Sequence, residues 1–554
     1  MKKSSILAGL VLACLLALTA CGGNGGQQND SQSGTPDAPA ANAPADSGAA
    51  DGENQSQTPA GGETAVEGGT FTMAIEESIN SLAWYNNNST DQGEQVFQSL
   101  YDPMWKTNND GSQVYYLAES CDVSGDGTVY TVHLRQDALW HDGEQITADD
   151  LMFTMDWFAD PECGSRMAAA RFKVDGEFCL YEKVDEFTVQ YTISRPSNLF
   201  GEKLGYTRIL PEHIFQGVPA ADVLTCEENN LGVGTGAFQL EEFVVGEKMV
   251  LKRNENYYGE KAHIDTLEIR CIANTGTQEV AFRSGELSVY TISNAETLAA
   301  FRGDSAYNLN SYADGRITFM QINPNSEAMS TMEARQAVIY ALNLDEILQG
   351  TYGSEELSRK ANSIQSTESM FHNPNTKNYE QDVEKAKSLV ESTGLADKTL
   401  HIIFNSSRVG MQEMAVMVQS QLQAVGIKAE VDSMDTSGYF SAYFYATDSY
   451  DLAFMGNGMR GDPGNYAGLF NNTKSGANMY TTEEVNNLWD ELDREMDPAK
   501  RQELIDQVDA ALMDCWSCVP IADTNCVFAS QPNIRGLEDT DRMTDLTRIY
   551  FVEQ

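Results

Sequence analysis

Two short loops carry residues whose types and spacing could bind a small molecule. The first, FNSSRVG at residues 404–410, follows the strand-like KTLHIIF and precedes a helical run that begins near Met411. This order places Arg408 at the carboxyl edge of a sheet, where α/β folds bind ligands, and beside a helix N-terminus, which favours anions. We predict that Arg408 binds an anionic group of a ligand; a solvent-facing surface arginine is the alternative.

The second loop lies within YDLAFMGNGMRGDPGNYAGLF, residues 450–470, where an apolar strand runs into a glycine-rich stretch. Such a stretch can be a simple connection between elements, or it can form one wall of a binding site. Its candidate ligand contacts are Asn457, Gly458, Met459 and Asp462.

No pattern in the sequence provides the reacting groups that an enzyme needs. The chain has no GxSxG, HExxH or GxxxxGKS/T motif, and LGVGTGAF leads into a strand-like segment rather than a helix. Its six histidines are scattered, and His141 is expected in a turn or in packing. Asp122 and Asp126 belong to a hairpin around SGDG rather than to a calcium site. We predict a protein that is not an enzyme and binds no cofactor or resident metal.

The first residues predict export. Lys2 and Lys3 precede an apolar run in MKKSSILAGLVLACLLALTAC, the layout of a secretory signal, which we assign to residues 1–20. The end of this run, LTAC, resembles the bacterial lipobox, so a diacylated Cys21 would anchor the protein at the extracytoplasmic face of the cell membrane. An ordinary secretory signal is the alternative. Residues 21–68, rich in Gly, Ala, Pro and Asp, predict a disordered linker.

The charge balance argues against nucleic acid as a partner. The formal net charge is −46, and a surface this negative repels phosphate backbones.

Cysteine usage leaves several possibilities open. Eight of the ten cysteines follow the first 21 residues, which permits up to four disulfides in an exported protein without fixing their pairing. CWSC at residues 515–518 could form a redox pair, but a strand-like segment follows it, whereas a redox motif of this kind starts a helix.

The elements that must hold the two loops indicate an α/β fold. KTLHIIF, a helix from Met411 and IKAEVDSM give a strand, a helix and a strand, which together predict a parallel βαβ unit. Met414, Val418 and Leu422 share one face of that helix and are expected in the core. Earlier in the chain, TVYTVHL alternates like a strand, and Thr147 is expected to cap a helix over ADDLMFTMDWF.

Longer blocks of the sequence resemble one protein family. They are LYDPMW, LAESCDVSGDGTVYTVHLRQDALWHDGEQITADDLMFT, GVGTGAFQLEEF, RNENYY, FRSGELSVY, EARQAVIYALN and DVEKAKSLVESTGL. These blocks are similar, in order, to the signature blocks of the family 5 extracellular solute-binding proteins. That family comprises the peptide-, nickel- and related solute-binding lipoproteins of ABC importers, and the resemblance extends from about residue 70 to the C-terminus.

The resemblance implies a two-lobed α/β fold of the periplasmic-binding-protein type II class. Two segments would cross between the lobes, near residues 316–323 and 517–524. Lobe I would comprise residues 69–316 and 520–554, and lobe II residues 317–519. The ligand would lie between the lobes, which would close by a hinge motion.

The resemblance also implies a function, that of the monomeric substrate-binding component of an ABC importer, which captures an oligopeptide and delivers it to the permease. In peptide-binding relatives a basic residue in the loop that contains Arg408 receives the peptide carboxylate, and an arginine can do so through two parallel hydrogen bonds. Their first strand meets the peptide backbone, so EESINSLAWYN would form another wall of the site, with Trp84 and Tyr85 as contacts. Core packing is the alternative for both aromatic residues. The alternatives for the protein are a non-peptide solute (a chelated metal, a modified amino-acid compound or an oligosaccharide) or a sensory lipoprotein without transport.

The chain departs from the peptide-binding pattern at one position. In peptide-binding relatives an aspartate three residues before an Asp-Pro pair binds the peptide's amino group, whereas here Met459 precedes the pair at Asp462. An unpaired buried ammonium costs several kcal/mol. Either Asp462 or another acid, such as Glu76 or Glu77, replaces the aspartate, or the ligand has no free amino terminus at this place.

Overall fold

The computed structural model describes residues 64–76, 78–85, 91–108, 112–163, 172–406, 408–445, 448–459, 461–471, 479–539 and 545–553. The predicted signal at residues 1–20, the lipidation site Cys21, Glu77 and all of the predicted linker up to residue 63 lie outside these ranges. Within them, no helix combines the length and the apolar composition that crossing a bilayer requires.

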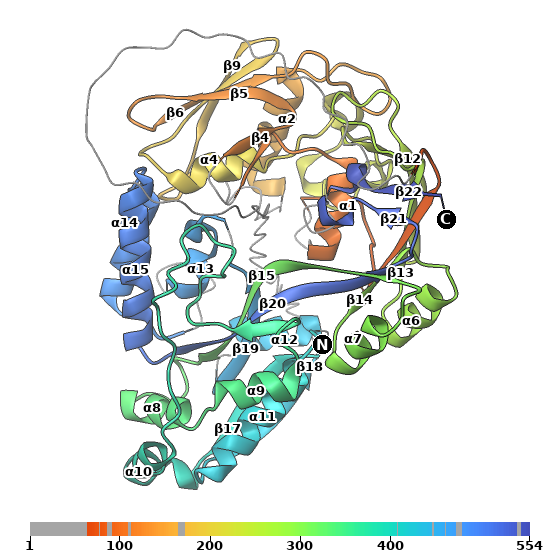
Figure 1. The fold of residues 1–554 in the computed structure, drawn as a ribbon. Coiled ribbons are helices and arrows are strands. Elements are labelled where there is room, and N and C mark those ends of the chain that lie inside the picture. The colour runs from red at the N-terminus through yellow and green to blue at the C-terminus, as the bar shows by residue number, and fades with distance from the viewer. Residues whose placement is uncertain are drawn as a thin grey trace, which may run out of the picture.

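One lobe is built on two four-stranded sheets (Figure 1). The first has the order β11-β12-β13-β2. Its strands are β2 (Thr70–Ile75), β11 (Phe238–Val244), β12 (Lys248–Arg253) and β13 (Thr266–Cys271). β2 runs parallel to β13, and its residues Phe71, Met73 and Ile75 are buried.

The second sheet of this lobe has the order β5-β6-β10-β9 and contains the predicted hairpin. Its strands are β5 (Ala118–Val123), β6 (Val129–Leu134), β9 (Leu180–Asp185) and β10 (Thr188–Thr192). The Asp126 carboxylate accepts hydrogen bonds from the Thr128 N–H at 3.2 Å and the Ser124 hydroxyl at 2.6 Å, which explains it as part of the turn. Thr147 caps α2 (Ala148–Ala159), as predicted, in a reciprocal capping box with Asp150.

A seven-stranded sheet runs through the middle of the molecule, with the order β14-β20-β15-β19-β17-β18 and β16 paired to β20. Its strands are β14 (Val289–Ile292), β15 (Asn308–Ile322), β16 (Ser358–Lys360), β17 (Thr399–Asn405), β18 (Lys428–Met434), β19 (Leu452–Gly458) and β20 (Cys518–Ser530). The long strands β15 and β20 pair antiparallel along nearly their whole length and lie side by side across the middle of Figure 1. Apart from one end residue each, Asn323 and Ser517, both predicted crossing segments lie within strands that pair with one another.

The predicted βαβ unit is confirmed. β17 and β18 pair in parallel, and α11 (Met411–Ala424) connects them. Met411, Met414, Val418 and Leu422 are all buried, so the methionine-containing stripe is core packing, as expected.

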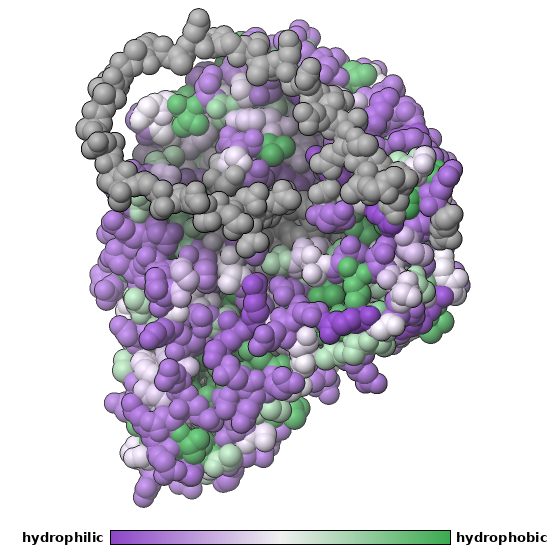
Figure 2. All heavy atoms as spheres, in the orientation of Figure 1, coloured by the Kyte–Doolittle hydropathy of each residue, from purple (hydrophilic) through white to green (hydrophobic). Residues whose placement is uncertain are grey.

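Buried apolar residues form three clusters that follow this architecture. The first cluster fills the lobe of the two four-stranded sheets, and the other two lie against the central sheet. The second cluster already includes Phe282, Leu298 and Phe301, ahead of the boundary that the sequence places at residue 316. The bounds of the two lobes thus stay a prediction. Hydrophilic residues make up most of the coloured part of the face seen in Figure 2.

The remaining elements frame these sheets. They are β1 (Ala65–Val66), α1 (Asp91–Leu100), β3 (Trp105–Thr107), β4 (Gln113–Tyr115), β7 (Lys173–Val174), β8 (Glu177–Phe178), α4 (Asn198–Gly205), α5 (Glu212–Phe215), α6 (Thr275–Arg283), α7 (Ala295–Arg302), α8 (Met332–Tyr340), α9 (Leu344–Thr351), α10 (Val383–Thr393), α12 (Thr436–Tyr445), the 3₁₀ helix η5 (Pro463–Tyr466), α13 (Ala467–Phe470), α14 (Glu483–Arg494), α15 (Pro498–Asp514), β21 (Ile534–Arg535) and β22 (Tyr550–Val552).

Candidate functional site

Arg408 lies in the loop between β17 and α11, at the carboxyl edge of the parallel strands, as the sequence predicts. Its backbone N–H donates to Asn405 O at 3.1 Å, and its side chain is half-buried. Among the described residues none forms an ion pair or a hydrogen bond with the guanidinium. The N-terminus of α11 beside it has no side-chain cap, so its backbone N–H groups add to the positive potential. This corner of the molecule can receive an anion.

The geometry of the same loop depends on Gly410. This residue has φ 78°, and a Cβ built on it would lie 2.8 Å from Thr351 Cγ2. Only glycine fits both constraints without strain, so the turn that presents Arg408 is fixed by the backbone.

The second loop begins inside the central sheet. Asn457 and Gly458 are the last residues of β19 and pair with Ile317 and Arg316 of β15. The Arg316 guanidinium donates to Gly456 O at 3.1 Å, and its Nε lies 3.6 Å from an Asp314 carboxylate oxygen. The Asn457 side chain is half-buried, and its Nδ2 donates to Gly458 O at 3.3 Å.

Met459 lies in the core. Its side chain is fully buried in the third cluster, and its backbone bonds to Gly315 at 2.8 Å and Ser366 at 3.1 Å. In this conformation the thioether offers no polar contact and no surface to a ligand.

Asp462 is committed to partners within the protein. Its carboxylate forms an ion pair with Arg501 of α15 and accepts from Asn198 Nδ2 at 2.5 Å and from the Gly464 N–H at 2.8 Å. The Arg501 side chain is 3% exposed, so this is a buried pair. Asp462 therefore carries no spare negative charge for a ligand ammonium.

The Asp462 contact belongs to a wider polar surface between the lobes, which we call the seam. On one side are Arg195, Ser197, Asn198 and Glu202, in or just before α4, and on the other are Asp462, Asp493 and Arg501. Asp493 accepts from Arg195 at 2.9 Å and from the Ser197 hydroxyl at 2.7 Å. The apolar residues of α4 belong to the first cluster, whereas those of η5, α14 and α15 belong to the third. The seam is thus where two separate cores meet.

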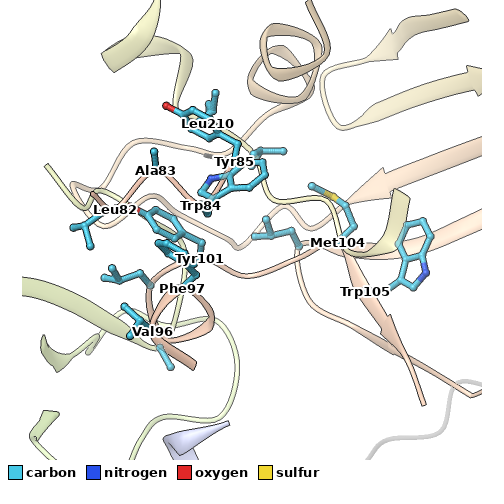
Figure 3. Packing of buried hydrophobic residues seen from close by; sticks show 14 of the residues in the cluster. Leu82, Ala83, Trp84, Tyr85, Val96, Phe97, Tyr101, Met104, Trp105 and Leu210 are labelled. Carbon is cyan, nitrogen blue, oxygen red and sulfur yellow. The ribbon is translucent and has the colours of Figure 1, made fainter. Parts of the chain in front are cut away.

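Trp84 and Tyr85 are core residues, which is the alternative that the sequence left open (Figure 3). Trp84 is 7% exposed, and its ring stands edge-on to Tyr85 at 5.3 Å and to Phe158 at 5.9 Å. The Tyr85 hydroxyl donates to Val223 O at 3.2 Å, and burial raises the pKa of this phenol. The cavity beside both rings measures about 10 Å³, enough for about one water molecule and far too small for a peptide.

His141 has a structural role, as expected. Its Nε2 bonds to Gly236 O at 3.0 Å, and its Nδ1 accepts from the Gly234 N–H at 3.1 Å. A Cβ on Gly234 would lie 2.0 Å from Leu100 O, so the glycine-rich segment packs tightly against α1. Within the described ranges, no three side chains from His, Cys, Asp and Glu are grouped to hold a metal ion.

The CWSC segment is buried. Cys515 ends α15 and Cys518 begins β20, and both are free thiols. Burial raises the pKa of both thiols, which disfavours the reactive thiolate. The segment does not have the exposed, low-pKa cysteine that a redox pair needs.

Sequence reasoning missed the seam. Arg195, Glu202 and Arg501 lie in segments without an unusual local pattern, and the contact of Arg195 with Asp493 joins residues 298 positions apart. The one available signal was the aspartate before Pro463, which was assigned to the ligand.

Comparisons with known proteins agree with this architecture. A family model described as bacterial extracellular solute-binding proteins, family 5 Middle, matches residues 113–479. The dipeptide-binding protein of Escherichia coli K12 is 28% identical over 374 residues, which cover 63% of this chain and 68% of that protein.

Solved structures show the same fold. The ABC transporter substrate binding protein CtaP of Listeria monocytogenes superposes with a TM-score of 0.79 at 26% identity, over 88% of this chain and 100% of that one. NikZ of Campylobacter jejuni, solved in complex with Ni(L-His), reaches 0.74 at 20% identity over 87% and 99% of the two chains. The predicted two-lobed α/β fold is confirmed.

Proposed function

Because this chain belongs to family 5 of the bacterial extracellular solute-binding proteins, we propose that it is the substrate-binding component of an ABC importer and captures an oligopeptide between its lobes. The observation that carries this proposal is the half-buried Arg408, whose guanidinium has no partner among the described residues and lies at the N-terminus of α11. A peptide carboxylate would accept two hydrogen bonds from it. Ligand contacts with both lobes would favour the closed state, and no reaction would take place.

The amino end of the ligand would be bound differently from that of an ordinary peptide. Asp462 is paired with Arg501, and Met459 lies in the core. We therefore favour ligands without a free ammonium near this loop. Among peptides, these are peptides with a blocked amino terminus or peptides whose amino terminus lies away from this loop. Asn457 and the main chain of Gly458 would contact the part of the peptide that reaches the loop.

A second candidate ligand class follows from the same observation. A carboxylate-bearing solute that is not a peptide, such as a chelated metal or a modified amino-acid compound, would use Arg408 and need no ammonium anchor; an oligosaccharide would use the polar loop alone. The likeness to NikZ, solved with Ni(L-His), supports including such ligands. A sensory lipoprotein would bind the same solutes but would not engage a permease.

The position in the cell is part of the proposal. Residues 1–20 would be the signal, Cys21 the lipid-modified residue and the chain from residue 22 to about residue 63 the tether to the extracytoplasmic face of the membrane. The linker predicted up to residue 68 is too long at its end, because Ala65 and Val66 form β1 and pair with β22. We expect Cys21→Ser to move the protein from the membrane fraction to the medium or periplasm. Retention in the membrane fraction would refute the anchor.

The test of binding is a thermal-shift screen of purified protein against peptides, N-acetylated peptides, histidine–nickel complexes and oligosaccharides. A ligand at about a hundred times its dissociation constant stabilises the folded state by roughly 2.7 kcal/mol, which such a screen detects. Solution scattering should show compaction with any hit. If no member of any class shifts the transition, the proposed function fails.

A further inference from the structure

The buried side of the seam contains more carboxyl groups than guanidinium groups. Glu202 of α4 is 9% exposed and lies beside the ion pair of Asp462 and Arg501. Two carboxyl groups thus share one guanidinium in a site from which water is largely excluded. Arg501 also donates to the main-chain oxygens of Leu492 and Glu495, so its donors are divided among several acceptors.

The two carboxyl groups are bonded unequally. Asp462 accepts from Arg501, Asn198 and Gly464, which are the partners that an ionised carboxylate needs. Glu202 lies near the Asn465 side chain and the Asp462 backbone, but its Oε2 has no hydrogen-bond partner among the described residues. A buried ionised oxygen without a partner is costly, whereas a protonated carboxyl group is not.

We propose that Glu202 is neutral when the two lobes are in contact, so that closure takes up a proton and weakens as the solution becomes alkaline. The inference rests on the proposed function in one respect, because it takes the two lobes to move. Separation of the seam would expose Glu202 to water, where an ordinary glutamate is ionised.

The electrostatics of the contact agree with this assignment. Burial, followed by the negative charge of Asp462, raises the pKa of Glu202 to about 8, and Asn465 and Arg501 only partly oppose the rise. A carboxyl group with a higher pKa in the closed state binds its proton more tightly there. The contribution of Glu202 therefore favours closure most at acidic pH and is lost as the pH rises from its ordinary range to about 8.

Several elements pack against α4 and carry charged or titratable groups. On β3 the buried Lys106 lies over the Tyr116 ring. On η5, burial raises the pKa of the Tyr466 phenol, which therefore stays neutral. On α14, the Asp493 carboxylate accepts hydrogen bonds from Arg195 and Ser197. On α4 itself, Lys203 follows Glu202 in the sequence. Tyr130 of β6 lies against Gly201, and burial raises the pKa of its phenol. Arg501 is thus the one cation among these groups that directly balances the two carboxyls.

The test measures the distance between the lobes without any ligand. Dyes are attached through a non-natural amino acid at residue 182 on β9 and residue 391 on α10, which are exposed and lie on opposite lobes in Figure 1. Energy transfer is recorded between about pH 6 and about pH 9 in wild type, in Glu202→Gln and in Glu413→Gln, an exposed control on α11.

We expect transfer in wild type and in Glu413→Gln to fall as the pH rises, and transfer in Glu202→Gln to remain high throughout, because glutamine imitates the neutral acid. The infrared carbonyl band of a protonated carboxyl group should be present at about pH 6 and reduced in Glu202→Gln. A pH-independent wild type, a response retained in Glu202→Gln, or a Glu202→Gln protein that is open throughout would each overturn the proposal. Since no ligand is added, these outcomes are independent of the solute screen.

Discussion

Asp462 and Arg501 form a buried ion pair, and the same carboxylate accepts a hydrogen bond from Asn198 of the other lobe at 2.5 Å. Asp462, one of the acids that could replace the family's aspartate, is therefore occupied by the protein itself. This arrangement links the loop after β19 to the contact between the lobes.

Removing Arg501 should destabilise the protein strongly. Arg501→Met leaves Asp462 buried without its counter-charge, which costs about 3–5 kcal/mol of unfolding free energy. Adding Asp462→Asn should recover part of that loss, since both charges are then absent. Urea unfolding of the two single variants and the double variant measures this coupling. Lys387→Met, which breaks an exposed pair with Glu384, is the control and should cost less than about 1 kcal/mol. Strictly additive losses would refute the coupling.

Replacing Arg408 should weaken ligand binding and leave stability nearly unchanged. Arg408→Ala removes charge-assisted hydrogen bonds worth about 1.5–3 kcal/mol, so affinity for the best carboxylate-bearing hit should fall roughly ten- to a hundredfold. Arg408→Lys should retain part of the affinity, because it keeps the charge and loses the paired geometry. Calorimetric titration checks both variants, with Arg302→Ala on the surface of α7 as control. An unchanged affinity in Arg408→Ala would show that this arginine is a surface residue that does not contact the ligand.

Stability should depend on pH through Asp509. Burial raises the pKa of this carboxyl on α15 from 3.8 to about 7, and Gln365 and Ser363 lower it only in part. Because the folded state binds the proton more tightly, the contribution of Asp509 is fully present below about pH 4 and is lost as the pH rises to about 7.

Asp509→Asn should therefore be more stable than wild type at about pH 8 by a few kcal/mol, and the difference should shrink at about pH 4. Urea unfolding at several pH values measures it, with the exposed Asp397→Asn as control. A difference that is constant with pH would contradict the assignment.

Gly410→Ala should be costly, because the new Cβ meets Thr351 at 2.8 Å and the backbone has φ 78°. We expect a loss of at least about 1–2 kcal/mol together with weaker ligand binding, since the turn presents Arg408. Gly394→Ala is a matched control: its φ is 72°, but nothing lies within 4 Å of its added Cβ. The difference in melting temperature between the two variants isolates the steric part. Equal losses of stability in the two variants would mean that the Thr351 side chain moves aside without a cost in free energy.

The parts of the fold that repeat a local period could be predicted from the sequence. The spacing of Met414, Val418 and Leu422 predicts a buried helix face, and Thr147 with Asp150 predicts the start of a helix. Trp84 and Tyr85 could not be resolved in the same way, because an aromatic side chain serves a core and a binding wall equally well. Arg408 could be placed at a sheet edge, since the order of strand, loop and helix determines that position. Whether its guanidinium was already paired depended on distant residues, and only the structure could answer that question.

The antiparallel ladder of β15 and β20 has a consequence for biogenesis. Asn308 pairs with Ser530 and Gln321 with Cys518, so every rung joins positions about two hundred residues apart. Contacts this distant in sequence carry a large loop-closure penalty and form slowly. The ladder cannot begin to assemble until the ribosome has made nearly the whole chain, and a truncated or stalled product would leave β15 with an unpaired edge open to aggregation.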